Sequence, residues 1–380
     1  MTARNSIIPV FVPHLGCPND CVFCNQRRIS GHIEPATAQT VKNAIEEAAA
    51  LTPPGTKRQL AFYGGSFTAI PEARQIELFE AAQPYLADGT ISSIRLSTRP
   101  DAIDGTVLKR LKKYGVTVIE LGAQSMCDRV LELSGRGHDS AAVADASKLI
   151  KAAGFDLILQ MMTGLPGDTD ETCIETAKKI IDLAPNGVRI YPTVIVRDTV
   201  LCDMWRAGTY KEHTVEDAVR VCSKIVPLFN KAGIPIIRMG LNPTEDLSGG
   251  DALGGAYHPA LGELVHSRIM LEKARGLLAG VKPGSRVVLG VNRSDVSKMI
   301  GQHRCNVHAL VSEFSLRELR IHEASVKSGE TPVTSVTATV VNESGTEITS
   351  ASNTAPTGSL ENFSVKVTPT DDAKVYADGT

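Results

Sequence analysis

Three kinds of signal are missing from this sequence of 380 residues. No apolar run approaches the ~18 residues that a membrane-spanning helix needs, so no such helix is predicted. The first residues contain no apolar core of a secretory signal peptide, so export is not expected. The formal net charge is only −2, which gives no general reason to expect a nucleic-acid partner. Together these absences predict a cytoplasmic protein without a membrane partner.

A disulfide framework is also missing, because the eight cysteines do not follow the pattern of a small secreted protein. Cys17, Cys21 and Cys24 lie within eight residues of one another. A tight group of thiols in a cytosolic protein indicates a metal site. The other five have no ligand spacing and are interpreted as small apolar side chains. They are Cys127, Cys173, Cys202, Cys222 and Cys305.

The composition that is present suits a globular protein with a sizeable core, at 42% hydrophobic and 22% charged residues. The length predicts roughly two to three domains. The charge is unevenly distributed, since residues 326–380 carry a net charge of −4 and residues 1–325 a net charge of +2. The weak argument against a nucleic-acid partner therefore does not apply to the first 325 residues.

Residues 1–240 alternate strand-like and helical segments about six times. Gln59–Tyr63 and Val116–Leu121 are strand-like, whereas Thr37–Leu51 and Asp139–Ala153 have helical spacing. Continuously apolar strands are typical of a parallel sheet that is covered on both faces. A doubly wound sheet and a full or partial TIM-like βα barrel both fit this pattern. Both place the active site at the carboxyl ends of the strands.

Three further segments follow this α/β region. Residues 241–284 are expected to form an irregular and then helical extension, and residues 285–323 a small α+β unit. Residues 324–380 are interpreted as a polar tail or a β-rich appendage, because Ser and Thr supply 17 of the last 50 residues.

The three clustered cysteines have the spacing C-x3-C-x2-C in the loop after the strand-like run Ile7–Val12. Three thiolates on one loop can each bind one iron of a cubane cluster and leave the fourth iron open for a ligand. A zinc ion completed by His14 or His32 is an alternative, and three incidental thiols are another. No second C-x2-C pair supports the zinc alternative.

This spacing, with Phe23 before the third cysteine, resembles the radical SAM superfamily. The resemblance is strengthened by the segment Phe62–Thr68, which contains two glycines at the end of the second strand. It implies a partial or full parallel βα barrel and a 4Fe–4S cluster on Cys17, Cys21 and Cys24. It also implies that an external donor reduces the cluster, which cleaves S-adenosylmethionine to a 5′-deoxyadenosyl radical. The Gly64-Gly65 segment would hold the amino group of S-adenosylmethionine, and Ser66 would also help to position this cofactor.

Four later segments resemble a narrower group, which contains the oxygen-independent coproporphyrinogen III oxidases and the Elongator catalytic subunit. Within that group, Arg99–Asp101 and Tyr191–Thr193 favour the Elongator side. The resemblance implies that Gln124 and Arg136 contact S-adenosylmethionine. The four segments are Leu121–Ser125, Gly135–His138, Met162–Gly167 and Ile190–Thr193.

Two acidic residues of the oxidases correspond to Ser97 and Gln160 here, which disfavours a porphyrin substrate. The catalytic side chains are not identified by this resemblance. Tyr63, His138 and Tyr191 lie near strand ends and are weak candidates to face the substrate.

Within residues 285–323, the expected order of strand, helix, helix and strand resembles a KH nucleic-acid module. A KH module clamps the nucleic-acid backbone with a G-x-x-G loop. Gly301 stands at this turn, but Arg304 replaces the second glycine. The candidate RNA contacts are Lys298, Gly301, His303 and Arg304. A small packing domain with a charged surface is the alternative.

The sequence thus predicts a radical SAM enzyme with an unidentified substrate, and the Elongator resemblance favours transfer RNA. No acetyltransferase domain is expected, because only about 140 residues follow position 240. The alternatives are a tetrapyrrole-related radical SAM enzyme or haem carrier, a non-catalytic RNA-binding protein, and a zinc-stabilised protein. The sequence does not determine the oligomeric state or the fate of S-adenosylmethionine.

Overall fold

The computed structural model describes residues 5–12, 17, 21–25, 36–242, 247–325, 327–329 and 333–337. The chain forms two compact units, Met1–Leu261 and Gly262–Thr380. The predicted extension 241–284 is divided between these units. Most of the predicted tail 324–380 lies outside the described residues.

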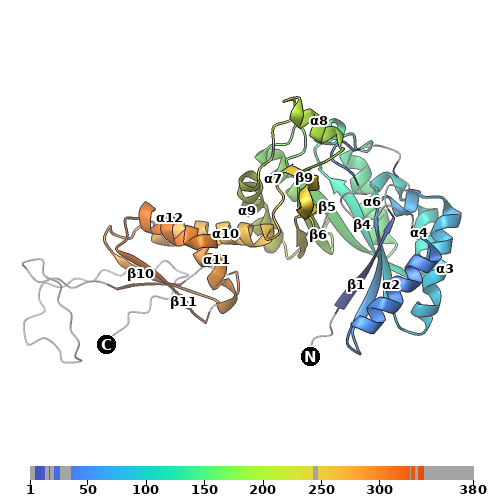
Figure 1. The fold of residues 1–380 in the computed structure, drawn as a ribbon, viewed down its shortest axis with the longest axis horizontal. Coiled ribbons are helices and arrows are strands. Elements are labelled where there is room, and N and C mark those ends of the chain that lie inside the picture. Colours follow the sequence, from blue (N-terminus) through green and yellow to red (C-terminus); the bar gives the residue numbers. More distant parts are fainter. Residues whose placement is uncertain are drawn as a thin grey trace, which may run out of the picture. The chain divides into compact units, whose positions relative to one another are not determined.

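Unit 1 is built on a sheet of seven parallel strands whose spatial order follows their order in the chain. A doubly wound sheet would reverse its strand order at a switch point, so the doubly wound alternative is wrong. The sheet curls into a half-barrel with edge strands β1 and β8 (Figure 1), which confirms the predicted partial TIM-like barrel. The strands are β1 (Asn5–Val12), β2 (Lys57–Gly64), β3 (Ser93–Thr98), β4 (Val116–Gln124), β5 (Asp156–Thr163), β6 (Gly187–Pro192) and β8 (Ile236–Met239).

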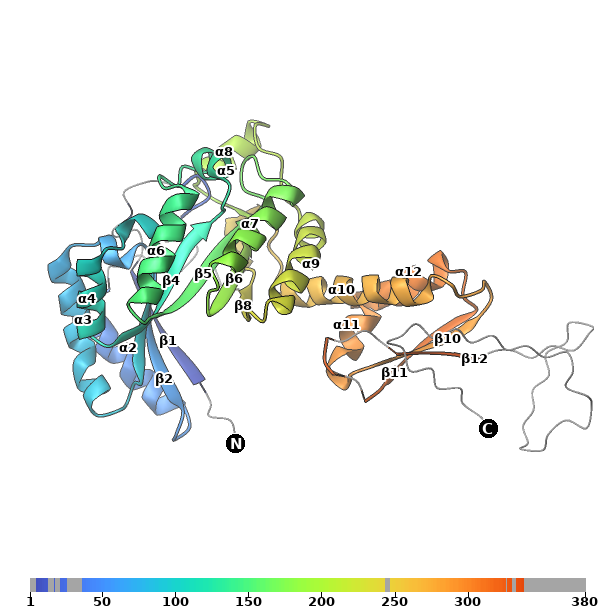
Figure 2. The same ribbon diagram turned by 180° about the vertical axis from the view of Figure 1, so that it is seen from behind.

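The longer helices of unit 1 cover the convex face of the sheet (Figure 2). Several begin at Thr or Asp side chains that accept a hydrogen bond from the first turn, as Thr37 and Asp139 do. The helices are α2 (Ala38–Leu51), α3 (Glu72–Ala87), α4 (Gly105–Lys113), α6 (Ser140–Ala152), α7 (Asp170–Asp182) and α9 (Val215–Lys231), with the shorter α5 (Asp128–Leu133) and α8 (Val200–Arg206).

Side-chain alternation along the strands separates the core from the concave face. In β2, Phe62 is fully buried and its ring centroid lies 5.8 Å from that of Phe79 in α3. The next residue, Tyr63, points to the opposite face and lines a pocket. The apolar core therefore lies between sheet and helices, and polar side chains are left on the concave face.

A small antiparallel pair, which the sequence did not predict, lies beyond the end of β6. Strand β7 (Val194–Val196) pairs with β9 (Ala252–Gly255). Val22 of the cysteine loop donates its N–H to the Ser134 carbonyl at 3.1 Å and accepts from the Leu201 N–H at 2.7 Å. Val22 and Phe23 also pack against buried residues of β7 and α8. These contacts anchor the cysteine loop on the rest of unit 1.

Unit 2 contains a three-stranded sheet in the order β11–β10–β12, with helices packed against it. Strand β10 is parallel to β11 and antiparallel to β12. Leu289, Met299 and Leu310 are fully buried in its core. The elements are α10 (Leu261–Leu278), β10 (Arg286–Val291), α11 (Val296–Ile300), α12 (Cys305–Glu313), β11 (Glu318–Glu323) and β12 (Val333–Thr337).

No helix in the described part of the chain is both long enough and apolar enough to cross a membrane.

Candidate active site

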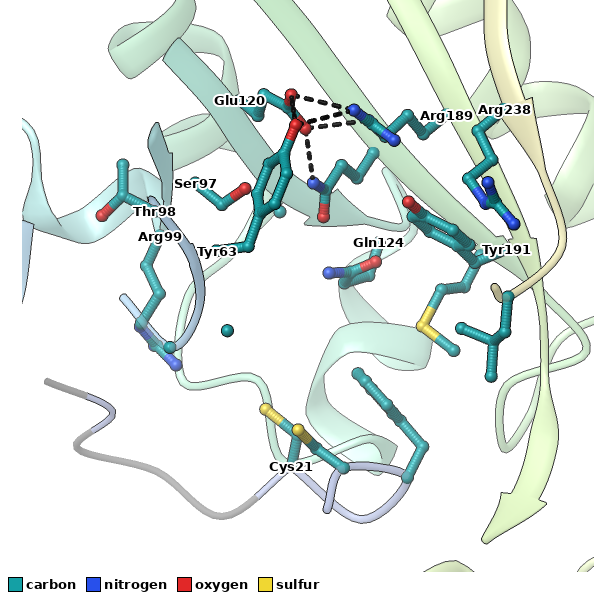
Figure 3. A pocket seen from close by; sticks show the side chains of 18 of the residues that line it. Cys21, Tyr63, Ser97, Thr98, Arg99, Glu120, Gln124, Arg189, Tyr191 and Arg238 are labelled. Carbon is teal, nitrogen blue, oxygen red and sulfur yellow. Dashed lines mark hydrogen bonds and ion pairs between the residues drawn. The ribbon is translucent and has the colours of Figure 1, made fainter. Parts of the chain in front are cut away.

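A pocket of about 660 Å³ lies on the concave face of unit 1, a volume that suits a small molecule (Figure 3). The three predicted cluster ligands, Cys17, Cys21 and Cys24, all line it. So do six other predicted residues, whereas Ser66 and His138 are absent from its lining. The six are Tyr63, Gly64, Gly65, Gln124, Arg136 and Tyr191.

Positive charge lies beside the thiols of Cys17 and Cys21. The Arg136 Nη1 group donates to the Cys21 Sγ atom at 3.2 Å, while its Nη2 group donates to the Gly122 carbonyl at 2.6 Å. Burial raises the pKa of Cys17, and a hydrogen bond from the Ser66 N–H opposes this shift, as do the charges of Arg99 and Arg136. These donors stabilise sulfur atoms that carry negative charge.

The chemistry of the three thiols fits an iron–sulfur cluster. His14 and His32, the candidates for a fourth zinc ligand, lie outside the described residues. In a cubane cluster each thiolate binds a separate iron, so the sulfur atoms need not share one ion. Thiolates are ligands for zinc and for iron–sulfur clusters alike, so the spacing on one loop rather than ligand softness favours the cluster.

The predicted Gly-Gly turn is fixed between two neighbouring strands. Gly64 has φ +111°, and a Cβ atom there would lie 3.1 Å from backbone atoms of Val12. Gly65 donates its N–H to the Val12 carbonyl at 2.9 Å. The Ser66 hydroxyl lies 2.9 Å from the Thr98 Oγ1 atom and accepts from the Arg99 N–H at 3.2 Å. The turn therefore presents bare backbone to the pocket, and the Ser66 hydroxyl is occupied within the protein.

Gln124 combines two features of a binding residue. Its φ is +65°, in the left-handed region that residues other than glycine rarely adopt. This residue lies at an irregularity in the pairing of β4 with β5. Its Oε1 atom is buried without a hydrogen-bond partner in the described part of the chain. Backbone strain and an unsatisfied buried oxygen are typical of a site that binds a ligand.

Arg99 also lines the pocket, although sequence reasoning assigned it no role. It donates to both carboxylate oxygens of Asp101, at 2.9 and 3.0 Å, and to the Arg136 carbonyl at 2.6 Å. These bonds hold the Arg99 guanidinium near the thiols. The sequence Arg99–Asp101 contains a signal for this orientation, because an arginine and an aspartate two residues apart are close enough to form the local ion pair seen here.

Sequence reasoning missed a fully buried carboxylate in the pocket, Glu120 on β4. Its side chain is fully buried, and its Oε1 atom accepts from the Arg95 Nη1 group at 3.0 Å and from the Tyr63 hydroxyl at 3.1 Å (Figure 3). Its Oε2 atom lies 2.9 Å from the Arg189 Nε atom and accepts from the Gln160 amide at 3.1 Å. Because four partners from four strands meet at one carboxylate, no local pattern could reveal it.

Electrostatics keep the phenols of this pocket neutral. Burial, reinforced by the nearby negative charge of Glu120, raises the pKa of Tyr63 to about 12. Burial also raises the pKa of Tyr191. The Arg189 guanidinium donates to the Tyr63 oxygen at 3.0 Å, and the Glu120 charge raises the pKa of that guanidinium. Both tyrosines therefore present hydroxyl groups near neutral pH.

His138 lies outside the pocket lining and is neutral near physiological pH. Burial lowers its pKa to about 4, and the positive charges of Arg136 and Arg99 act in the same direction.

In unit 2, three of the four candidate RNA contacts lie at the turn between α11 and α12, and the fourth, Lys298, lies in α11. Gly301, His303 and Arg304 all have left-handed backbone, with φ of 75°, 50° and 62°. Arg304 adopts this conformation at the position where a G-x-x-G loop has its second glycine. Lys298 pairs with Asp295 at 2.7 Å.

Comparison with known proteins gives consistent matches. A family model described as the radical SAM superfamily matches residues 11–180, and one for the radical SAM C-terminal domain matches residues 185–270. A tRNA uridine(34) acetyltransferase of Methanocaldococcus infernus is 26% identical over 301 residues, which are 69% of this chain and 55% of that protein. Elongator complex protein 3 of Homo sapiens is 26% identical over 257 residues, 57% of this chain and 47% of that protein. The chain thus spans about half the length of these relatives.

A solved structure shows a similar fold. Archaeal Methanocaldococcus infernus Elp3 with an N-terminal deletion superimposes with a TM-score of 0.57 and 23% sequence identity. The match covers 76% of this chain and 71% of that one.

Proposed function

The chain belongs to the radical SAM superfamily of 4Fe–4S and S-adenosylmethionine enzymes, and from this premise we propose that unit 1 cleaves S-adenosylmethionine reductively. One observation carries the proposal. The cysteine loop, the bare Gly64-Gly65 backbone and the unpartnered Gln124 oxygen all face one pocket. The proposed reaction also requires an external electron donor that reduces the cluster.

Cys17, Cys21 and Cys24 would hold the cluster, which when bound supplies the electron that cleaves S-adenosylmethionine to a carbon radical. Arg136 donates to the Cys21 sulfur, and the Ser66 N–H donates to that of Cys17. These donors would stabilise the negative charge of the thiolates and keep the loop in place. The contacts of Val22 on either side of the loop support the same role.

Gly64, Gly65, Gln124 and Arg136 would position S-adenosylmethionine, with Ser66 acting through its contacts to Cys17 and Thr98. The absence of side chains at the glycines lets a ligand approach the backbone closely. The Gln124 Oε1 atom is an acceptor that lacks a donor, and the ammonium of an amino acid is such a donor.

Tyr63 and Tyr191 are the better candidates for facing the substrate, because both line the pocket. His138 does not line it, so its assignment as a catalytic candidate has no geometric support. Enclosure by the half-barrel would shield a radical from water and from side reactions.

The test uses the full chain, reconstituted anaerobically with iron and sulfide. We expect absorbance near ~400 nm, as thiolate-held clusters show, and 5′-deoxyadenosine after reductant and S-adenosylmethionine are added. Cys21→Ala should abolish both signals. Cys305→Ala is the matched control, since Cys305 is exposed in unit 2, and it should retain both. A colourless protein that retains zinc after reconstitution would overturn the proposal.

We propose transfer RNA as the substrate. Two of the relatives above are named as a tRNA acetyltransferase and an Elongator protein, and the left-handed turn 301–304 supports an RNA-binding unit. The tetrapyrrole alternative has weaker support, because Ser97 and Gln160 line the pocket where the oxidases use acids.

Incubation with total transfer RNA, followed by nucleoside mass spectrometry, should reveal a new modified nucleoside. Arg304→Gln should weaken transfer-RNA binding severalfold. Arg320→Gln, an exposed change on β11, should leave this binding unchanged. An equal loss of transfer-RNA binding in both variants, or no loss in either, would contradict a role of the turn 301–304 in RNA binding.

A further inference from the structure

We propose that Arg189 and Arg238 form an anion-binding wall in the pocket, which holds a phosphate or carboxylate group of the substrate. The inference rests on the proposed function, because it assigns the substrate end of the same pocket.

The pocket lining carries more positive than negative charge. Among the described residues that line it, Glu120 is the only carboxylate, whereas four are arginines. Two of these are engaged near the thiols, Arg99 with Asp101 and Arg136 with Cys21. The charge balance at the other end therefore depends on Glu120, Arg189 and Arg238.

Glu120 is already neutralised without Arg238. Arg95 and Arg189 both contact its carboxylate, at 3.0 and 2.9 Å, so one negative charge faces two positive charges. Its remaining acceptor positions receive hydrogen bonds from Tyr63 and Gln160. An excess positive charge in a partly buried site is costly unless an anion accompanies it.

Arg238 adds a further positive charge beside that of Arg189. It is the partner of Arg189 in the register between β6 and β8. Its Nε group donates to the Gly240 carbonyl at 3.0 Å, which orients the guanidinium. No carboxylate in the described part of the chain forms an ion pair with it. Its two terminal nitrogens are therefore available for a planar, two-point contact with an oxyanion.

The position of this wall suits a substrate rather than the cofactor. Figure 3 shows Cys21 at the opposite end of the pocket from Glu120, with Arg238 and Tyr191 side by side along one wall. Tyr191 keeps its proton, because burial raises its pKa, and so its hydroxyl is a further donor. A group bound here leaves the rest of the substrate directed toward the thiol end.

Two sources of an oxyanion follow from the candidate substrates. A nucleotide supplies a phosphate group, and a coproporphyrin supplies carboxylates. The shared chemistry is a multidentate oxyanion, and the experiment separates the two sources.

The experiment measures probe binding by anaerobic titration calorimetry on the reconstituted full chain, saturated with S-adenosylmethionine. The probes are uridine 5′-monophosphate, uridine as its neutral counterpart, and coproporphyrin III. We expect one anionic probe to bind, and uridine to bind at least about tenfold more weakly than its monophosphate if the phosphate is the source. Arg238→Gln should weaken binding of the anionic probe at least about tenfold, and Arg238→Lys should restore part of it.

Arg206→Gln is the matched control, because Arg206 lies in α8 with its side chain 58% exposed, away from the pocket. It should bind the probe as the unchanged protein does. Cluster absorbance and circular dichroism show whether each variant is folded. The inference is overturned if neither anion binds at millimolar concentration, or if Arg238→Gln binds as tightly as the unchanged protein. Failure of the proposed function has a different signature, the absence of 5′-deoxyadenosine in the unchanged protein.

Discussion

Glu120 is the residue on which the deep end of the pocket depends, because side chains from four other strands meet at its carboxylate. Glu120→Gln would leave Arg95 and Arg189 without their counter-charge. Breaking a buried ion pair from one side typically costs about 3–5 kcal/mol. We expect a loss of this size in the free energy of unfolding, measured by urea denaturation.

The control for this change is Glu72→Gln, because Glu72 pairs with Arg110 but its side chain is 64% exposed. An exposed pair contributes about 0–1 kcal/mol. Equal losses in the free energy of unfolding of the two variants would contradict the contribution to stability that we assign to the Glu120 contacts.

His138 makes stability depend on pH in mildly acidic solution. Its pKa is lowered from 6.5 to about 4 by burial and by neighbouring arginines, so between these values the unfolded chain binds a proton that the folded chain does not. This contribution is fully present above pH 6.5 and is lost as the pH falls from about 6.5 to 4. His138→Asn should flatten this part of the profile of the cluster-free protein, as followed by thermal unfolding. An unchanged slope would contradict the assignment, and measurements above pH 7 provide the baseline.

Sequence reasoning identified residues whose chemistry is local and missed those whose partners are distant. Cys17, Cys21 and Cys24 are recognisable because three thiols lie on one loop. Glu120 lies in a strand that is otherwise apolar, and nothing near it in the sequence indicates a role. Its role depends on contacts with Arg95 and Arg189, which lie on separate strands. Gln124 was found through a family resemblance, although its left-handed backbone has no signal in the sequence.

At the scale of elements, the turn after β2 shows why a glycine is required rather than merely tolerated. Gly64→Ala would place a Cβ atom 3.1 Å from three backbone atoms of Val12, which are fixed by strand pairing. The same change also forces alanine into a left-handed conformation, which costs about 1–2 kcal/mol. We expect Gly64→Ala to lose cleavage of S-adenosylmethionine and more stability than conformation alone explains.

Gly89→Ala isolates the conformational part of that cost. Gly89 has φ +79°, and a Cβ atom there would meet nothing within 4 Å. This variant should lose only about 1–2 kcal/mol and retain cleavage. Equal effects of the two changes, measured by urea denaturation and 5′-deoxyadenosine formation, would contradict the proposed role of the turn.

The βα alternation of unit 1 was predictable because its strands are apolar and its helices carry capping residues. Strand β8 was missed, because it is short and contains Arg238. Strands β7 and β9 were missed because each consists of only three or four residues that pair across a long separation. Pairing of this kind depends on tertiary contacts rather than on a local pattern.

At the scale of the whole molecule, each of the two units has its own apolar core, and the pocket belongs entirely to unit 1. Leu289→Ala removes a fully buried side chain from unit 2 and should cost about 2–5 kcal/mol there. Cluster absorbance and cleavage of S-adenosylmethionine should persist. Leu60→Ala, at an equally buried position in β2, should impair them instead. Loss of cleavage in Leu289→Ala would show that the chemistry depends on unit 2.

The central strand β4 joins the buried carboxylate to the cysteine side of the pocket. It carries Glu120 and Gly122, and at its carboxyl end Gln124, where the backbone turns left-handed, and all three line the pocket. The residue that gathers the arginines and the residue with the unpartnered acceptor therefore belong to one strand. A shift in the register of β4 would displace both at once, so the two ends of the pocket are mechanically coupled through this strand.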